Sequence, residues 1–339
     1  MKYQQILEAI RALPEQDRKK IIDELTGGTI KHDYISTRRE KLLNRQVGCP
    51  HCKSLKFYRY GHDKGCSRFM CKDCKRTFTE FTGTWVSGLH KKELVNDYLD
   101  LMDQQKSLDK IKVALKINKK TAFDWRHKIL SSLVGAKTED FEGIVESDET
   151  FFRYSQKGNK KLQDKGRKRG SGYSKRGSPK DKVAVIVTAD RKGSMDLSVA
   201  SIGGIDRHDI ENAIGYRISK DAIICSDGST SYKSFASENE LQLVVLRADL
   251  KQFVKQKIYH IQNVNSLHNN LKKWIDSTFW GVSTKYLQNY LYWFKLQQIC
   301  KKSTCAIQDI VNDSLEDLYA RYHFRHINDR YQRLIATLI

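Results

Sequence analysis

The stretch "GIVESDETFF", residues 143–152, begins the part of the chain in which strands and helices alternate. Its β-branched and aromatic residues predict a strand that carries the polar group "ESDET". Residues 182–190 and 194–202 predict a following hairpin, and residues 221–227 and 241–247 predict two more strands. Helical patterns occupy residues 207–218 and 232–239 between these strands. The second half of the chain is therefore predicted to be an α/β domain.

A helix follows the last of these strands. In "YHIQNVNSLHNNLKKW", residues 259–274, Val264, Leu267 and Leu271 recur at the spacing of one helix face. The resulting order β-β-β-α-β-α-β-α is that of a ribonuclease H-like domain, with a mixed sheet and helices. We expect residues 139–299 to form this domain.

Two aspartates stand near the ends of neighbouring strands. Asp148 lies in the first strand, and Asp227 comes just after the fourth, where Gly228 lets the backbone turn sharply. We expect their carboxylates to meet at one edge of the sheet and to bind Mg²⁺ or Mn²⁺. Two such ions about 3.5–4 Å apart can support an in-line phosphoryl transfer. The alternative role for each aspartate is to accept a hydrogen bond from a local backbone N–H group.

The polar face of the helix at residues 259–274 carries Asn265 and His268, one turn apart and on the same side. The side-chain carbonyl of Asn265 can coordinate Mg²⁺ without adding charge. His268 can coordinate the metal, orient a metal-bound water or contact the scissile phosphate. The alternative is a polar face that only hydrogen-bonds to neighbouring loops.

Residues 153–182 contain many lysines, arginines and glycines and hardly an apolar residue, including Arg167, Lys168 and Arg169. Such a segment cannot build a core, so we expect a mobile loop. Its charge and its place beside the first strand favour DNA contact over a purely solubilising insertion.

A cysteine-rich module precedes this domain. Cys49 and Cys52 form one CxxC pair, Cys71 and Cys74 form another, and eighteen residues separate the pairs. This spacing predicts a tetrahedral, structural Zn²⁺ site in a zinc ribbon, placed at residues 41–85. Basic residues among its aromatic residues favour additional contact with DNA, whereas the alternative is a site that only stabilises the fold.

Residues 86–138 predict a helix-turn-helix unit that binds DNA. Ile111, Ala114 and Leu115 are expected to form the inner face of the first helix. Ala122, Trp125 and Ile129 are expected to point inward from the second. The second helix is expected to present four basic residues to DNA: Lys119, Lys120, Arg126 and Lys128. A three-helix unit with a solvated basic face is the alternative.

The chain of 339 residues has a formal net charge of +21 and a pI near 9.5, which favours a polyanionic partner. Its longest apolar runs are shorter than the roughly 20 residues of a membrane span. We therefore expect a cytoplasmic, nucleoid-associated protein without a membrane partner. Residues 1–40 predict a helical lead-in, a basic stretch at residues 31–45 predicts a linker, and residues 300–339 predict a helical tail.

These motifs together carry a resemblance to a known family. The combination of "CPHC", "CKDC", "VESDETFF", "IICSDGSTSY" and "YHIQNVNSLHNNLKKWI" resembles bacterial insertion-sequence transposases with an N-terminal zinc ribbon and a DDE-type integrase domain. The resemblance places Asp148 and Asp227 at the first two catalytic positions. It places Asn265 at the third, with His260 five residues earlier as a DNA contact.

The resemblance implies an enzyme that binds the terminal inverted repeats of an insertion sequence. It would use Mg²⁺ to cleave the DNA with water and then join the released 3′-OH to target DNA. Pairing of two ends implies a homo-oligomer, at least a dimer. Many relatives carry glutamate at the third position, so Asn265 resembles a D-D-N variant. The alternative is an inactive, domesticated regulator that binds DNA without cutting it.

Overall fold

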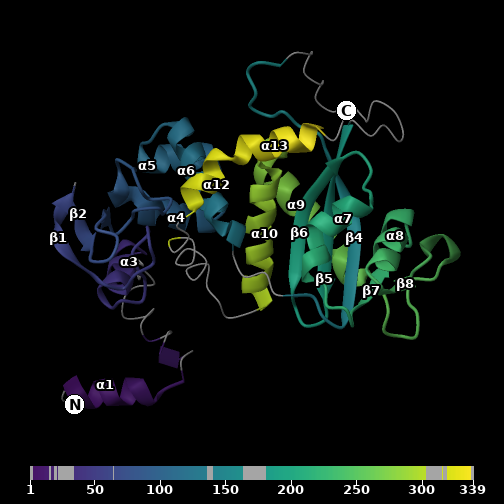
Figure 1. The fold of residues 1–339 in the computed structure, drawn as a ribbon, viewed down its shortest axis with the longest axis horizontal. Coiled ribbons are helices and arrows are strands. Elements are labelled where there is room, and N and C mark those ends of the chain that lie inside the picture. The colour runs from purple at the N-terminus through teal and green to yellow at the C-terminus, as the bar shows by residue number, and fades with distance from the viewer. Residues whose placement is uncertain are drawn as a thin grey trace.

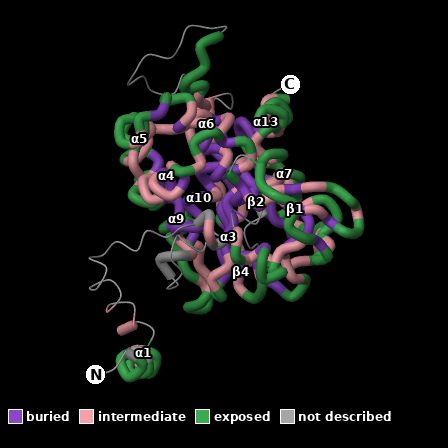
Figure 2. The backbone as a smooth tube through the Cα atoms, turned by 90° about the vertical axis from the view of Figure 1, so that its left-hand side faces the viewer, coloured by how far each residue is buried: buried purple, intermediate pink, exposed green. Residues whose placement is uncertain are grey.

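A computed structural model describes residues 3–14, 17–18, 21, 34–63, 65–135, 140–162, 181–302, 315 and 319–336. Figure 1 shows a molecule elongated from an N-terminal β-sheet, through a helical middle, to a larger sheet at the opposite end. Figure 2 shows the buried residues concentrated inside this body, while helix α1 (Tyr3–Ala12) lies apart from it in both views. No helix among the described residues is long and apolar enough to span a membrane.

The small N-terminal sheet is antiparallel and has the order β1-β2-β3. Its strands are β1 (Phe57–Asp63), β2 (Cys66–Cys71) and β3 (Thr77–Thr79). Three phenylalanines from these strands pack edge-to-face or stacked in its core: Phe57, Phe69 and Phe78. The sheet thus has a small apolar core of its own beside the cysteine pairs.

The basic stretch expected to be a linker contains a helix, α3 (Tyr34–Leu43). Leu42 is 1% exposed and belongs to the core of the small sheet. Arg39 forms a two-bonded ion pair with Glu80, and Arg38 donates a hydrogen bond to the backbone carbonyl of Glu80. The expectation of a linker here was wrong, because a single buried leucine and two arginines fix a helix whose sequence reads as polar.

The middle of the molecule is helical, as predicted. Its elements are η1 (Lys92–Leu94), α4 (Val95–Asp103), α5 (Leu108–Leu115), α6 (Lys119–Ser132) and η2 (Leu133–Gly135). Ser107 and Asn118 cap α5 and α6 through their side-chain oxygens. A short turn with Lys116 in the left-handed conformation joins these two helices.

The large sheet has five strands in the order β6-β5-β4-β7-β8. The strands are β4 (Ile144–Arg153), β5 (Lys182–Asp190), β6 (Met195–Ile202), β7 (Ile223–Ser226) and β8 (Gln242–Val245). The first three pair antiparallel, whereas β7 and β8 are parallel to β4. The predicted mixed sheet and the predicted order of strands and helices are confirmed.

Helices cover both faces of the large sheet. One face packs against α7 (Arg207–Ile214), followed by η4 (Gly215–Arg217), and α8 (Thr230–Glu238). The other packs against α9 (Gln262–Phe279), which η5 (Ala248–Leu250) precedes, and α10 (Leu287–Lys302), which η6 (Thr284–Tyr286) precedes. The C-terminal helix α12 (Ala320–Arg325) packs against α6, and α13 (Ile327–Ala336) contacts η6 and β6.

Helix α10 belongs to two hydrophobic cores. Leu291 and Phe294 pack in the core beside the large sheet, whereas Tyr290 and Trp293 pack in the core of the helical middle. The boundary expected between residues 299 and 300 falls inside this helix. The helical unit and the sheet domain are therefore joined by a shared, buried helix.

Candidate active site and metal centre

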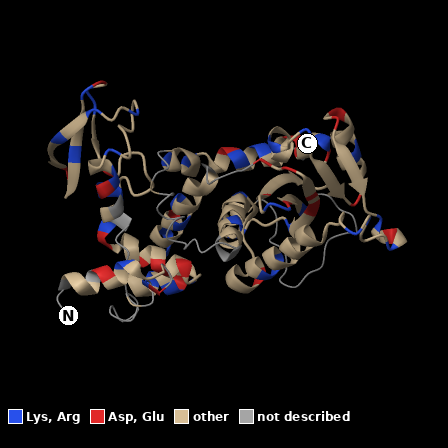
Figure 3. Cartoon of the chain, turned by 90° about the horizontal axis from the view of Figure 1, so that it is seen from below, with Lys and Arg blue, Asp and Glu red and all other residues tan. Residues whose placement is uncertain are grey.

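Basic residues occur along the whole length of the molecule, as Figure 3 shows. This distribution offers no single basic face as the place where a polyanion must bind. The candidate chemistry therefore has to be located from individual side chains.

Asp148 was expected near the end of its strand but lies in the middle of β4, and it is level with Asp227, which follows the adjacent parallel strand β7. Ile144 of β4 is paired with Ile223 of β7, and Glu146 with Cys225. Two residues further along each strand, the same register reaches Asp148 and Asp227. Asp227 is exposed just after β7, where its Oδ1 accepts a hydrogen bond from the backbone N–H of Ser229 at 3.0 Å. This hydrogen bond is the turn role that we considered as the alternative, and it leaves Oδ2 available.

The turn after Asp227 requires a glycine. Gly228 has a φ of +83°, and a Cβ atom at this position would lie 2.1 Å from Cγ1 of Val245 in β8. Tyr232, in the helix that follows, is fully buried and its hydroxyl lies 3.0 Å from the hydroxyl of Ser147. The backbone around Asp227 is thus held against both neighbouring strands.

A cluster of carboxylates surrounds Asp148. Burial, then the neighbouring charges of Glu149 and Asp227, raises the pKa of Asp148 to about 7. Burial and the charge of Asp227 also raise the pKa of Glu149, whose Oε2 is buried without a hydrogen-bond partner. A divalent cation held by Asp148 and Asp227 would relieve this repulsion. The residues present therefore fit a Mg²⁺ site.

His268 of α9 lies beside this cluster. Its Nδ1 is 4.0 Å from Oδ2 of Asp148, and its side chain is 10% exposed. Burial and the charge of Lys272 lower the pKa of His268 to about 4, so the imidazole is neutral at pH 7. Its Nε2 is buried and has no hydrogen-bond partner. A neutral imidazole in this position can coordinate a metal or hydrogen-bond to a phosphate.

Asn265 lies three residues before His268 in α9, and its side chain is exposed. The two are therefore not equivalent, because His268 is buried beside Asp148 whereas Asn265 faces solvent at this end of the helix. The apolar face predicted for α9 is confirmed, with Val264, Leu267 and Leu271 buried.

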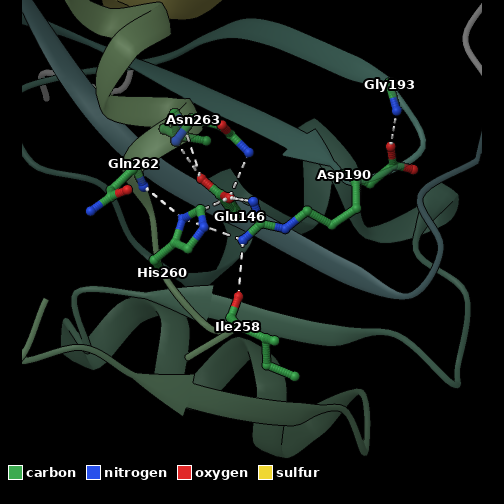
Figure 4. A network of polar contacts seen from close by, with 9 residues as sticks. Glu146, Asp190, Gly193, Ile258, His260, Gln262 and Asn263 are labelled. Carbon is green, nitrogen blue, oxygen red and sulfur yellow. Dashed lines mark hydrogen bonds and ion pairs between the residues drawn. The ribbon is translucent and has the colours of Figure 1, made fainter. Parts of the chain in front are cut away.

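Glu146 fixes the beginning of α9. Its carboxylate accepts hydrogen bonds from the backbone N–H groups of Asn263 and Val264 and from the side-chain amide of Asn263, at 2.9, 3.2 and 3.0 Å. It also forms an ion pair with Arg191 at 2.8 Å (Figure 4). These contacts engage both oxygens of the carboxylate, so Glu146 positions the helix and is not free to coordinate Mg²⁺.

His260 belongs to the same network. Its Nδ1 lies 3.4 Å from Oε1 of Glu146 and 3.3 Å from Nη2 of Arg191 (Figure 4). Arg191 was not among the predicted site residues. The available signal was a basic residue in the turn "DRKG" directly after the strand that pairs with β4.

The four cysteines of the two CxxC pairs converge as predicted. The Sγ atoms of Cys49, Cys52, Cys71 and Cys74 all lie within 4.8 Å of one another. The distances from Cys49 to Cys74 and from Cys52 to Cys71 are 3.7 and 3.5 Å. A tetrahedral ion with Zn–S bonds of about 2.3 Å needs sulfur atoms about 3.8 Å apart. The cluster could therefore hold zinc, and Cys66 is not part of it.

The helical unit presents only part of the predicted basic surface. Lys119 and Lys120 are exposed, and Lys128 is half-buried. Arg126 is only 1% exposed and donates a hydrogen bond to the backbone carbonyl of Lys106 at 2.7 Å. Its guanidinium also lies over the rings of Phe279 and Trp293, 5.8 and 5.6 Å from their centroids. The prediction that Arg126 faces DNA was wrong, because it anchors α6 in the core.

The predictions for the inner faces of α5 and α6 and for the loop at residues 153–182 differ in outcome. Ala122, Trp125 and Ile129 are buried, as predicted, whereas Ala114 is exposed and does not belong to the inner face of α5. Arg167, Lys168 and Arg169 lie outside the described residues, so their predicted contact with DNA stays a prediction.

Comparison with known proteins supports this interpretation of the large sheet. Residues 140–296 match the family described as the ISXO2-like transposase domain. These residues are therefore similar to the transposase domains of insertion sequences. The matched region contains all five strands of the large sheet and ends within α10.

A similar protein is the uncharacterised protein in transposable element ISH50 of Halobacterium salinarum. It is 27% identical over 277 residues, which cover 78% of this chain and 92% of that protein. A solved structure, a pre-cleavage Mos1 transpososome, covers 66% of this chain and 77% of its own. It has 12% identity and a TM-score of 0.20, a likeness too weak to bear on the fold.

Proposed function

We propose that the protein is a transposase that cleaves the ends of an insertion sequence and joins them to target DNA by in-line phosphoryl transfer. The proposal rests chiefly on the alignment of Asp148 with Asp227 inside the region that matches the transposase domain. The raised pKa of Asp148 supports it, because a carboxylate held among other carboxylates is suited to a cation.

In this proposal, Asp148 and Asp227 coordinate Mg²⁺ or Mn²⁺, and Asn265 completes the set as a neutral ligand. His268 would orient the scissile phosphate or help to hold the metal beside Asp148. When bound, the metal activates the attacking oxygen and stabilises the leaving oxygen. Water is the first nucleophile and the strand leaves with a 3′-OH. That 3′-OH attacks a target phosphodiester in the second step, so no covalent intermediate with the protein is needed.

DNA recognition is assigned to the N-terminal half. The four-cysteine sheet at residues 41–85, with Zn²⁺ as a structural ion, and the helices at residues 86–138 would bind the terminal inverted repeats. Lys119 and Lys120 support this, because they are exposed at the beginning of α6. The loop at residues 153–182 and His260 would add contacts near the cleavage site. Pairing of two ends requires an oligomer, at least a dimer.

The experiment is cleavage of a labelled duplex that carries the element's own end and flank, with Mg²⁺ or Mn²⁺. The variants are Asp148→Asn, Asp227→Asn, His268→Ala and Asn265→Ala. Asp221→Asn is the matched control, because Asp221 is exposed at the opposite end of β7 from Asp227. The expected result is a metal-dependent nick at the element boundary that is lost in both active-site aspartate variants and kept in the control.

The extent of the loss in Asn265→Ala would measure whether this exposed amide coordinates the metal. Specific binding of the ends without cleavage under either metal would contradict the proposal. It would favour the alternative, a regulator that has kept the DNA-binding surfaces and lost the third metal ligand.

A further inference from the structure

The segment between β8 and α9, residues 247–258, exposes an unusual amount of apolar surface. Leu250, Phe253, Val254 and Ile258 are 59, 57, 44 and 51% exposed. All four belong to one short stretch, and single exposed apolar residues elsewhere on a surface need no explanation. We call this stretch the β8–α9 segment. Its apolar side chains are unpartnered in a chain whose described residues otherwise bury most large aliphatic side chains in four cores.

Basic residues are interleaved with these apolar ones. The segment contains Arg247, Lys251, Lys255 and Lys257 but only one acidic residue, Asp249. Arg247 pairs with Asp249 through two hydrogen bonds at 2.8 and 2.6 Å, which leaves the three lysines as its net charge. Lys251 and Lys257 are exposed and Lys255 is half-buried. A partner for this surface must accept both apolar contact and several positive charges.

The segment has a defined and strained backbone. Lys251, Gln256 and Lys257 have φ values of 57, 47 and 63°, in the left-handed region that these residues adopt at a cost. A backbone bridge between Lys255 and Tyr259 closes its second half. Strain of this kind persists where the surrounding structure holds it, and it is frequent at binding sites.

The segment is fixed to the candidate active site at both ends. At its beginning, Leu246 donates a backbone hydrogen bond to Ser226, the residue before Asp227. At its end, the carbonyl of Ile258 accepts a hydrogen bond from Arg191, which also pairs with Glu146 (Figure 4). Figure 1 shows it beside β8, at the end of the molecule opposite the N-terminal sheet. The proposed metal site therefore lies between this segment and the N-terminal elements that would bind the inverted repeats.

We propose that the β8–α9 segment binds duplex DNA on the far side of the cleavage site, in the flanking or target DNA. Its lysines contact phosphates, and Leu250 and Phe253 insert from a groove and unstack a base step. Apolar wedges framed by basic residues are a known way to deform a duplex, and they need no particular sequence. Charge selects DNA over a second copy of this chain, whose net charge is also +21. The placement of this DNA beyond the cleavage site rests on the function proposed above, whereas the contact with DNA itself does not.

The test uses the full chain and two multiple variants. Lys251→Gln/Lys255→Gln/Lys257→Gln removes the charge, and Leu250→Ser/Phe253→Ser removes the wedge. Lys220→Gln and Tyr216→Ser are matched controls, because both residues are exposed, Tyr216 at 76%, in the connection before β7. Binding of a random-sequence duplex is measured over a series of salt concentrations. Fluorescence of 2-aminopurine, placed at successive positions in the flank of an end duplex, reports unstacking.

The lysine variant is expected to bind the random duplex about 10-fold more weakly, and its slope of log affinity against log salt is expected to fall by about two to three. The wedge variant is expected to lose the rise in 2-aminopurine fluorescence with a smaller change in slope. Both controls are expected to behave as the natural chain does.

Unchanged slopes together with unchanged fluorescence would overturn the inference. A shift from dimer to monomer in sedimentation, with DNA binding unchanged, would also overturn it and assign the surface to contact between copies. A slope that depends on the segment, in a protein that never cleaves DNA with Mg²⁺ or Mn²⁺, would contradict the proposed function and leave the DNA contact standing.

Discussion

The imidazole of His268 and the carboxylate of Asp148 lie 4.0 Å apart, yet burial of both groups opposes an ion pair between them. The pKa of Asp148 is raised to about 7 and that of His268 is lowered to about 4, in both cases mainly by burial. The carboxylate is therefore ionised only where the imidazole is already neutral. The distance alone meets the usual criterion for a salt bridge, but the pKa values decide the matter because they include the cost of burial. His268 also keeps a buried Nε2 without a hydrogen-bond partner.

This relationship predicts that Asp148→Asn stabilises the metal-free protein at pH 8. The pKa of Asp148 is about 7 when folded against an ordinary value of 3.8. Between these values the folded state keeps a proton that the unfolded state releases, so stability falls as pH rises through this window. Above pH 7 the loss of unfolding free energy caused by the ionised carboxylate is constant, at most about 4 kcal/mol. Asparagine carries no charge and therefore avoids it.

Thermal unfolding of the two proteins, in the presence of a chelator, measures the effect. The melting temperature of Asp148→Asn is expected to exceed that of the natural chain at pH 8, and the difference is expected to vanish near pH 4. Addition of Mg²⁺ should raise the melting temperature of the natural chain more than that of the variant. A variant that is less stable at pH 8 would contradict this explanation of the carboxylate cluster.

A second prediction concerns the beginning of α9. Glu146→Gln is expected to lower the free energy of unfolding by about 1–3 kcal/mol, because a buried charge-assisted capping network loses its charge and leaves Arg191 unpaired. It is also expected to reduce DNA cleavage, since α9 carries His268. Chemical denaturation checks the first effect. Glu142→Gln is the matched control, because Glu142 pairs with Lys192 at an exposed site and should cost little.

Removal of zinc gives a third prediction. A chelator, or the substitution Cys71→Ser, is expected to unfold the small sheet and abolish binding of the inverted repeats, because this sheet has few buried residues besides its cysteines. The large sheet has separate cores and is expected to keep its far-ultraviolet circular dichroism. Metal analysis should give one zinc per chain. Cys66→Ser is the control, since Cys66 lies outside the cluster, and loss of zinc in that variant would contradict the assignment.

Much of this fold follows from sequence periodicity alone. Strand β5 is an almost continuous apolar run, "KVAVIVTAD", and helical patterns follow the third, fourth and fifth strands of the large sheet, so order and type were both accessible. The CxxC pairs were equally clear, because their spacing constrains the chemistry. Helix α3 was not, because its helical pattern is weak and its anchoring depends on Glu80, which lies 41 residues from Arg39.

The site was predicted less completely than the fold. Periodicity placed Asn265 and His268 on one side of α9, but it could not show that His268 is buried beside Asp148 whereas Asn265 is exposed. Nor could it show that the partners of Glu146 come from α9 and from the turn after β5. Such distinctions depend on contacts between residues distant in sequence, which a single sequence does not contain.

The correction at Arg126 leads to the last prediction. A basic residue on α6 reads as a DNA contact, yet its guanidinium lies between the backbone of Lys106 and the rings of Phe279 and Trp293. Arg126→Met should therefore change stability and leave the salt dependence of DNA binding unaltered. Lys119→Gln/Lys120→Gln should do the reverse, and lower the salt slope by about two. Denaturation and binding titrations on the same two variants separate the outcomes. A lower salt slope in Arg126→Met, at unchanged stability, would return this arginine to the DNA-binding surface.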